Sequence, residues 1–137
     1  MDINPYLMFK GDCEAAFKFY EKVLGGKIEM MLRHRGSPVE EHTPPERLDQ
    51  ILHARLVAGS AVLMGSDSPP ERYPGENGFF VSIRVDSVQE AERIFAALCE
   101  GGTVLMPMEE TFWAERFGML RDRFGVNWMV NREKAQS

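Results

Sequence analysis

The 137-residue sequence has few of the features that mark secreted, membrane or zinc-finger proteins. Its two cysteines, Cys13 and Cys99, stand in no C-x-x-C or Cys/His spacing, which argues against a disulfide framework or a zinc site. No apolar run approaches the roughly 18 residues that cross a bilayer, and the N-terminus has no basic region followed by an apolar stretch. We therefore expect a cytoplasmic protein whose cysteines serve as small buried hydrophobic side chains.

Positive charge is also scarce. Lys and Arg number 16 against 21 Asp and Glu, which leaves a net charge of -5 and a pI near 5.2. This balance argues against nucleic acid or an anionic membrane as the main partner. Hydrophobic residues at 44% and charged residues at 27% are ordinary for a packed domain, and the length suits a single one.

An internal repeat organises the sequence. Each half has a strand-like run, a helical pattern that ends at a glycine pair, and three further strand-like runs. In the first half we expect strands over 5–9, 27–33, 50–57 and 60–64 and a helix over 14–24. In the second half we expect strands over 78–85, 103–108, 117–122 and 126–130 and a helix over 88–100. Each half therefore reads β-α-β-β-β.

The two halves are in register. The glycine pairs begin at Gly25 and Gly101, which are 76 residues apart (101 minus 25). Ser87 and Glu90 have the spacing of a capping box at the start of the second helix. One face of that helix carries the apolar residues at helical spacing: Val88, Ala91, Ile94, Phe95 and Leu98.

Two polar segments connect these elements. The stretch between Arg33 and Gln50 contains three prolines and no apolar periodicity, so we interpret it as a mobile flap that could close over a site with His34, His42, Glu40 and Glu41. The segment 65–77 holds three prolines and two glycines and is expected to join the halves. We expect one domain, with module one at 1–67, a linker at 68–77 and module two at 78–137.

Several motifs resemble one known family. They are YLMF at 6–9, EAAFKFY at 14–20, LMGSD at 63–67, FWAERFG at 112–118 and DRFGVNW at 122–128. With the tandem repeat, they resemble the PhnB-like branch of the vicinal oxygen chelate superfamily, which includes glyoxalase I, extradiol dioxygenases and bleomycin and fosfomycin resistance proteins. The resemblance implies an α+β fold in which two βαβββ modules form a cupped, mixed, mostly antiparallel sheet with helices on its convex side. It also implies a homodimer.

The resemblance bears on two activities. Proteins of this branch have carried a 3-demethylubiquinone methyltransferase label, but this sequence has no strand followed by a GxGxxG loop to support it. Superfamily members hold a divalent metal with His, Glu or Gln on inward-facing strand positions. In the second half those positions fall on Phe80 and Met129. In the first half their counterparts are Leu63, from the pairing of Gly59 with Gly125, and Pro5 or Tyr6, from the offset between the strand starts. None is a usual metal ligand.

Strand alternation gives the candidate ligand-contacting residues. Phe79, Val81, Ile83 and Val85 would face the helices, which leaves Phe80, Ser82 and Arg84 toward the cup. In the same way His53 and Arg55 face the cup, and the Gly59/Gly125 pairing makes Arg121 the equivalent of Arg55. The three arginines either attract an anionic ligand or pair with acidic neighbours across strands, and both alternatives remain open.

Aromatic residues and one histidine complete the candidates. Phe112, Trp113, Phe117 and Phe124 would wall an apolar pocket or belong to the core. Trp128 is expected in the core, and Asp122 is expected to accept turn N–H groups. His53 is either an acid/base or metal residue or a hydrogen-bonded side chain of the cup. An alternative metal set of His53, Asp67 and Glu115 is conceivable, although no spacing argues for it.

These residues lead to three hypotheses. The first is a metal-independent protein that binds a small apolar or anionic molecule; its ligand-binding candidates are Arg55, Arg84, Arg121, Ser82, Phe80, Trp113 and Met129. The second is a divalent-metal-dependent lyase, isomerase, dioxygenase or thiol transferase with His53 as the catalytic candidate. The third is a structural or regulatory dimer without a ligand. Fold-level analogy does not choose among them.

Overall fold

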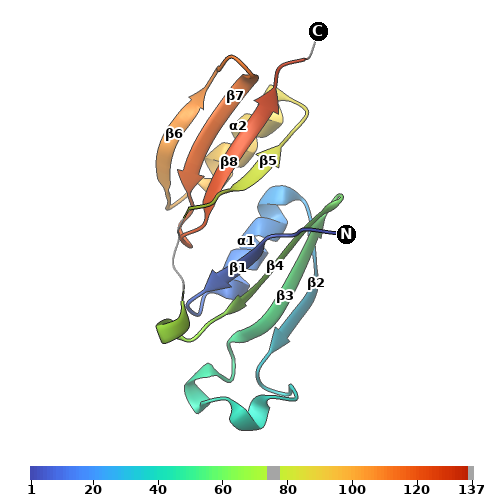
Figure 1. Ribbon diagram of the computed structural model, residues 1–137, viewed down its shortest axis with the longest axis vertical. Helices are drawn as coiled ribbons and strands as arrows, with labels where there is room; N and C mark the ends of the chain where they lie inside the picture. Colours follow the sequence, from blue (N-terminus) through green and yellow to red (C-terminus); the bar gives the residue numbers. More distant parts are fainter. Residues whose placement is uncertain (74–77, 136–137) are drawn as a thin grey trace. The chain divides into compact units, whose positions relative to one another are not determined.

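Figure 1 shows the chain as a computed structural model that describes residues 1–73 and 78–135. Backbone contacts divide the chain into two units, Met1–Gly75 and Glu76–Ser137. Each unit contains a four-stranded sheet and one α-helix. Within the described ranges, no helix is long and apolar enough to cross a lipid bilayer.

The sheet of the first unit, sheet A, is mixed. Its strand order is β1-β4-β3-β2, in which β1 runs parallel to β4 and the other neighbours are antiparallel. Helix α1 packs against β2, β3 and β4. The elements are β1 (Tyr6–Phe9), α1 (Cys13–Leu24), β2 (Lys27–Arg33), β3 (Ile51–Ala58) and β4 (Ala61–Asp67).

The sheet of the second unit, sheet B, repeats this topology. Its order is β5-β8-β7-β6, with β5 parallel to β8 and the remaining pairs antiparallel. Helix α2 packs against β7 and β8. The elements are β5 (Val81–Arg84), α2 (Val88–Leu98), β6 (Thr103–Glu109), β7 (Ala114–Arg121) and β8 (Asn127–Glu133). The predicted α+β fold of two βαβββ modules with mixed, mostly antiparallel sheets is confirmed.

Four predicted boundaries are wrong by three residues, including the end of β8, which continues to Glu133 beyond the predicted residue 130. β5 begins at Val81, three residues later than predicted, and β7 begins at Ala114 instead of Phe117. β4 continues to Asp67, because residues 65–67 pair with β1 despite their polar composition. The predicted linker at 68–77 follows the last residue of β4. Within it, Pro70–Arg72 forms a short 3-10 turn, and residues 74–77 lie outside the described part of the chain.

Each helix buries one apolar face. In α2 the Ser87 side chain accepts the Glu90 N–H at 3.1 Å, which confirms the predicted cap. The buried residues of α2 are Ala91, Ile94, Phe95 and Leu98, and those of α1 are Cys13, Ala16, Phe17, Tyr20 and Val23. Trp128 is buried as predicted, and its Nε1–H donates to Asp122, which also accepts the N–H groups of Phe124 and Val126.

The segment between β2 and β3 folds back on itself. It contains two 3-10 turns, Glu40–His42 and Pro45–Arg47. Arg35 forms an ion pair with Asp49 at 2.8 Å across its base, and its backbone N–H donates to Leu48. The expected flap is therefore a compact loop with its own hydrogen bonds, at the end of sheet A where β2 stops and β3 starts (Figure 1).

Candidate functional site

Each sheet has one face that packs on its helix and a second face, called here the open face, that points away from it. A Cβ on Gly65 would meet the Phe17 ring of α1, and one on Gly118 would meet the Phe95 ring of α2. Strand alternation from these two glycines fixes the direction of the other side chains. The open faces carry Tyr6, His53, Arg55 and Met64 in sheet A, and Ser82, Arg84, Phe117, Met119, Arg121 and Met129 in sheet B.

The predicted alternation holds within β5. Val81 and Ile83 are half-buried, whereas Ser82 and Arg84 are exposed. Phe79 departs from it: the side chain is 58% exposed because the residue precedes the strand.

Strand pairing corrects two predicted equivalences. One row of paired residues joins Tyr6, Met64, Arg55 and Met30 across sheet A, and another joins Ser82, Met129, Met119 and Met106 across sheet B. Met64 is therefore the counterpart of Met129, and Met119 is the counterpart of Arg55. Pairing Leu63 with Met129 was wrong, because Leu63 faces α1, and pairing Arg121 with Arg55 was wrong by two residues.

The cause is the length of two turns. β3 and β4 are joined by two residues, whereas five residues separate β7 from β8. Aligning Gly59 with Gly125 ignored this difference, and a slip of one residue moves a side chain to the other face of a sheet.

The donor chemistry at the corrected positions does not fit a divalent metal. The four equivalent open-face positions hold Tyr6, Met64, Ser82 and Met129. Hard ions such as Mg²⁺ and Mn²⁺ prefer carboxylate and carbonyl oxygens, Zn²⁺, Fe²⁺ and Ni²⁺ also take imidazole, and thioethers favour soft ions such as Cu(I). The remaining candidate, Phe80, lies before β5 and carries no donor atom.

His53 has a partner that the sequence did not reveal. The Tyr6 hydroxyl lies 3.1 Å from His53 Nδ1, and the two rings are 5.7 Å apart and nearly parallel. The pair lies on the open face of sheet A, where a phenol and an imidazole can pass a proton to a bound molecule. Strand alternation predicts the orientation of His53, whereas the sequence marks Tyr6 only through its strand position relative to the superfamily's metal ligands.

The three arginines are held separately. Arg55 forms an ion pair with Glu29 across β2 and β3 at 3.0 Å, which is the cross-strand pairing considered above. Arg121 donates to Asn127 at 3.0 Å. Arg84 lies 3.9 Å from Asp86, whose side chain is 96% exposed. The strand partners of Arg84 and Arg121 are four residues apart on β8, roughly 13 Å, so these two do not form a cluster.

Asp67 and Glu115 have structural partners. Asp67 is buried, and its carboxylate accepts the backbone N–H groups of Gly11, Cys13 and Ile51 at 2.9 to 3.0 Å. Glu115 lies 3.5 Å from Arg132. Within each unit, over residues 1–73 and 78–135, no three His, Cys, Asp or Glu side chains gather as a metal-binding group.

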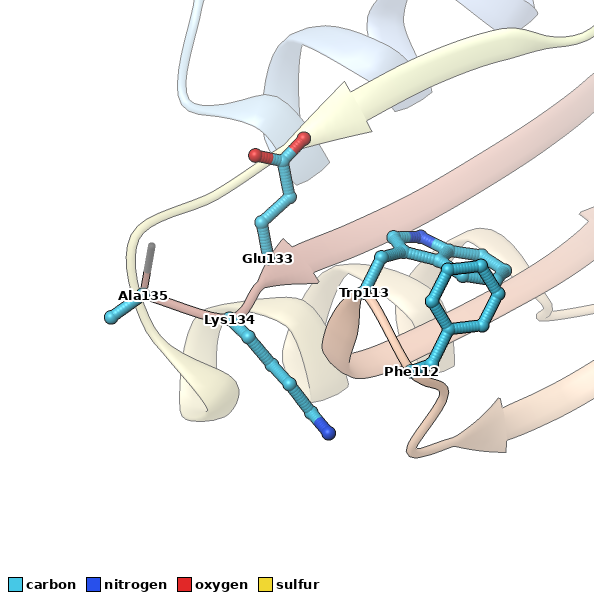
Figure 2. Close-up of a pocket in the computed structure, with 5 residues that line it drawn as sticks. All are labelled: Phe112, Trp113, Glu133, Lys134 and Ala135. Atoms are coloured by element: carbon cyan, nitrogen blue, oxygen red, sulfur yellow. The ribbon is translucent and has the colours of Figure 1, made fainter. Parts of the chain in front are cut away.

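A pocket of about 340 Å³ opens at the end of sheet B where β7 begins and β8 ends. Figure 2 shows the Phe112 and Trp113 rings on one side and the Glu133–Ala135 stretch on the other, with the Glu133 and Lys134 side chains pointing in opposite directions. The Lys134 N–H donates to the Trp113 carbonyl, which fixes the two sides together. Of the four aromatic residues that the sequence suggests for a pocket or the core, Phe112 and Trp113 line this cavity.

The surroundings of the pocket are partly aromatic and partly charged. Trp113 meets Phe112 and Phe117 edge to face, with ring centroids 4.9 and 5.3 Å apart, an arrangement that stabilises aromatic clusters. The Lys134 ammonium lies 2.8 Å from Glu110, and this hydrogen bond lowers the pKa of the Glu110 carboxyl. Sequence reasoning missed Glu133 and Lys134 because nothing in the spacing links the chain's last strand to the β6–β7 turn.

Comparison with known proteins agrees with the topology and the motifs. A protein from Pseudomonas aeruginosa, PA1353, has a crystal structure that is 51% identical, with a TM-score of 0.90 and coverage of 98% of this chain and 99% of that one. YjdN of Escherichia coli is 33% identical over 99% of this chain and 98% of its own. A PhnB protein from Bacillus cereus shares the fold at 23% identity, with a TM-score of 0.81 over 96% of this chain and 99% of that one.

The family profile gives the same answer over most of the chain. The Glyoxalase/Bleomycin resistance protein/Dioxygenase superfamily profile matches residues 2–130. The match spans both βαβββ units, and the solved neighbours include the PhnB type. The chain therefore belongs to the glyoxalase/bleomycin resistance/dioxygenase superfamily, known also as the vicinal oxygen chelate superfamily.

Proposed function

We propose that this protein binds a small apolar or anionic molecule on the open face of sheet B, without the usual metal ligands. The observation that carries the proposal is the pocket beside Trp113, whose ring lies 5.3 Å from the Phe117 ring on the open face of sheet B. Ligand sites are typically concave and largely apolar, with a few polar groups that set orientation.

The neighbouring side chains support this proposal. Met119 and Met129 pair directly next to Phe117 and offer flexible, polarisable surface to ligands of different shape. The Arg84 side chain is 62% exposed, and its contact with Asp86 is long at 3.9 Å. Because an exposed pair of this kind contributes little energy, the Arg84 guanidinium can turn to an anionic group on a bound molecule.

The test is a binding screen with a positional reporter. Aromatic carboxylates, alkyl phosphonates and neutral aromatics would be titrated by calorimetry and by tryptophan fluorescence. We expect quenching to come from Trp113, which is 42% exposed, and not from buried Trp128. Trp113→Ala should weaken binding at least about fivefold, since a buried aromatic contact is worth about 1–3 kcal/mol.

Charge is tested with a matched pair of variants. Arg84→Gln should weaken carboxylates and phosphonates but not neutral aromatics. Arg93→Gln is the control, because Arg93 lies on α2 and pairs with Glu90. If no compound binds, or if Trp113→Ala binds as tightly as the unmodified protein, the site is misassigned.

A second candidate function rests on the Tyr6–His53 pair, which could serve as the acid/base group of an enzyme of the superfamily type. This alternative includes a divalent metal held by residues other than the four equivalent positions. His53, Asp67 and Glu115 are the conceivable ligands, although no sequence spacing argues for them. Elemental analysis after loading with Zn, Mn, Ni or Fe(II) tests it. Stoichiometric metal that is lost in His53→Ala would favour the enzyme, and equal metal content in both proteins would remove His53 from such a site.

We also propose a homodimer that works in the cytoplasm. β6 is an edge strand of sheet B with Val104, Leu105 and Met106 each 39–50% exposed, and exposed apolar edges favour pairing with another chain. Both cysteines are free thiols, as expected in a reducing compartment. Sedimentation analysis of the protein and of Leu105→Lys would report the state, and a monomeric unmodified protein would contradict the dimer.

A further inference from the structure

His34 is a buried histidine at the base of the segment between β2 and β3. It follows β2 directly, its side chain is only 8% exposed, and its backbone N–H donates to the Gln50 carbonyl. Ring atom Nε2 is buried and has no hydrogen-bond partner among residues 1–73 and 78–135. Buried polar atoms almost always have a partner, so this exception calls for an explanation.

The hydrogen bonds around the ring determine where its proton lies. Nδ1 is 3.1 Å from the Thr43 hydroxyl, and that hydroxyl donates its own proton to the Val39 carbonyl at 2.8 Å. Thr43 therefore accepts from His34, so Nδ1 carries the hydrogen and Nε2 holds a bare lone pair. A proton added at Nε2 would create a buried cationic donor without an acceptor, which is more costly than a buried lone pair.

Charged groups near the ring act in both directions. The Arg47 guanidinium in the second 3-10 turn repels a charge on His34, and the Asp67 carboxylate of β4 attracts one. Asp67 is already engaged with three backbone N–H groups. Arg33 and Arg35, on either side in sequence, are paired with Glu14 and Asp49. Burial first and Arg47 second lower the pKa of His34 below its ordinary value of 6.5.

We propose that His34 is a proton-operated latch: its neutral ring keeps the segment 34–50 folded at the end of sheet A, and its protonation releases that segment. The ring and Thr43 join the start of the segment to its middle, and Arg47 joins its later part to the Asp67 carbonyl at 3.1 Å. A positive charge on His34 would repel the Arg47 guanidinium and place a buried donor at Nε2 without an acceptor, while Nδ1 would still donate to Thr43. The inference does not depend on the proposed ligand or its site.

The sign of the effect follows from linkage. Because the folded pKa is lowered, the neutral ring contributes stability that is complete above about pH 6.5 and is lost as pH falls from there through the folded pKa. One linked proton changes the opening equilibrium of the segment by at most about tenfold per pH unit. Since the chain contains only three histidines, His34, His42 and His53, the responsible ring can be identified by substitution.

The experiment measures amide hydrogen exchange and histidine titration on the full-length protein from about pH 5 to 8. Protection factors for residues 35–49, corrected for intrinsic exchange, should decrease as the pH is lowered. Those of Leu120 and Val130 in sheet B should stay constant. In the same NMR series His34 should titrate below its ordinary pKa of 6.5. Unchanged protection over 35–49, or a His34 pKa at or above 6.5, would overturn the latch.

Two variants complete the test. His34→Gln should make the protection of 35–49 independent of pH, and the control His42→Gln should keep the dependence of the unmodified protein. If His34→Gln opens the segment at every pH, its protection will match that of the unmodified protein at low pH, which also supports the latch. A dependence that persists in His34→Gln, or that disappears in His42→Gln, would refute it.

Discussion

Asp67 holds three backbone amides of the first unit, and replacing it by Asn should markedly destabilise that unit. Its two carboxylate oxygens accept the N–H groups of Gly11 and Cys13 at the start of α1 and of Ile51 at the start of β3. The side chain is buried, with 5% exposed. Asn has the same shape but one acceptor oxygen, so its NH₂ group must face an N–H donor in place of accepting from it.

The size of the effect can be worked from these contacts. Hydrogen bonds to a charged group are worth about 1.5–3 kcal/mol and neutral ones about 0.5–1.5, so the bonds that Asn can still accept lose roughly 1 kcal/mol each, and an N–H left without its acceptor costs about 1–3 kcal/mol. We therefore expect Asp67→Asn to lower the free energy of unfolding by about 3–5 kcal/mol. Against a total of about 5–15 kcal/mol for a domain, the loss is large.

Urea denaturation followed by far-UV circular dichroism measures this change. Tryptophan fluorescence is unsuitable as the only probe, because Trp113 and Trp128 both lie in the second unit. Asp86→Asn is the control: its side chain is 96% exposed, so its effect should stay within about 0.5 kcal/mol. If Asp67→Asn matches Asp86→Asn, the carboxylate does not organise the unit as argued.

Two further predictions concern packing and thiol chemistry. Gly65→Ala should destabilise the protein by about 1–3 kcal/mol in urea denaturation, because the new methyl group would lie 2.8 Å from the Phe17 ring and 2.9 Å from the Leu7 carbonyl; an unchanged midpoint would contradict the packing of α1 on β4. In alkylation at about pH 8 followed by mass spectrometry, partly exposed Cys99 should react well before buried Cys13. The reason is that burial and the Asp67 charge strongly raise the pKa of the Cys13 thiol. The reverse order would show that Cys13 is accessible.

The sequence was sufficient for the architecture because the two halves repeat the same local signals. The capping pair Ser87 and Glu90 and the glycine that follows each helix act over a few residues, and such signals can be read without tertiary structure. Polar residues at strand ends were harder. Asp67 belongs to β4 because β1 lies beside it, and a pairing across more than fifty residues leaves no local mark.

The candidate site could be predicted only in part. Alternation correctly gave the faces of His53 and Arg55, since it depends on one strand at a time. Equivalence between modules failed for Leu63 because it depended on a turn whose length differs between the halves. The Tyr6 partner of His53 was missed because the two residues lie on strands that are separated by β4.

The pairing of the first strand of each module with its last has a consequence for synthesis on the ribosome. β1 is an edge strand bonded only to β4, and Met8 and Ser66 on these strands are 58 residues apart. At about 5–20 residues per second, β1 leaves the ribosome roughly 3–12 s before its partner exists. The nascent first module therefore keeps β1 as an unpaired apolar strand until β4 has been synthesised. Sheet A is completed in a single late step, when β4 pairs with β1.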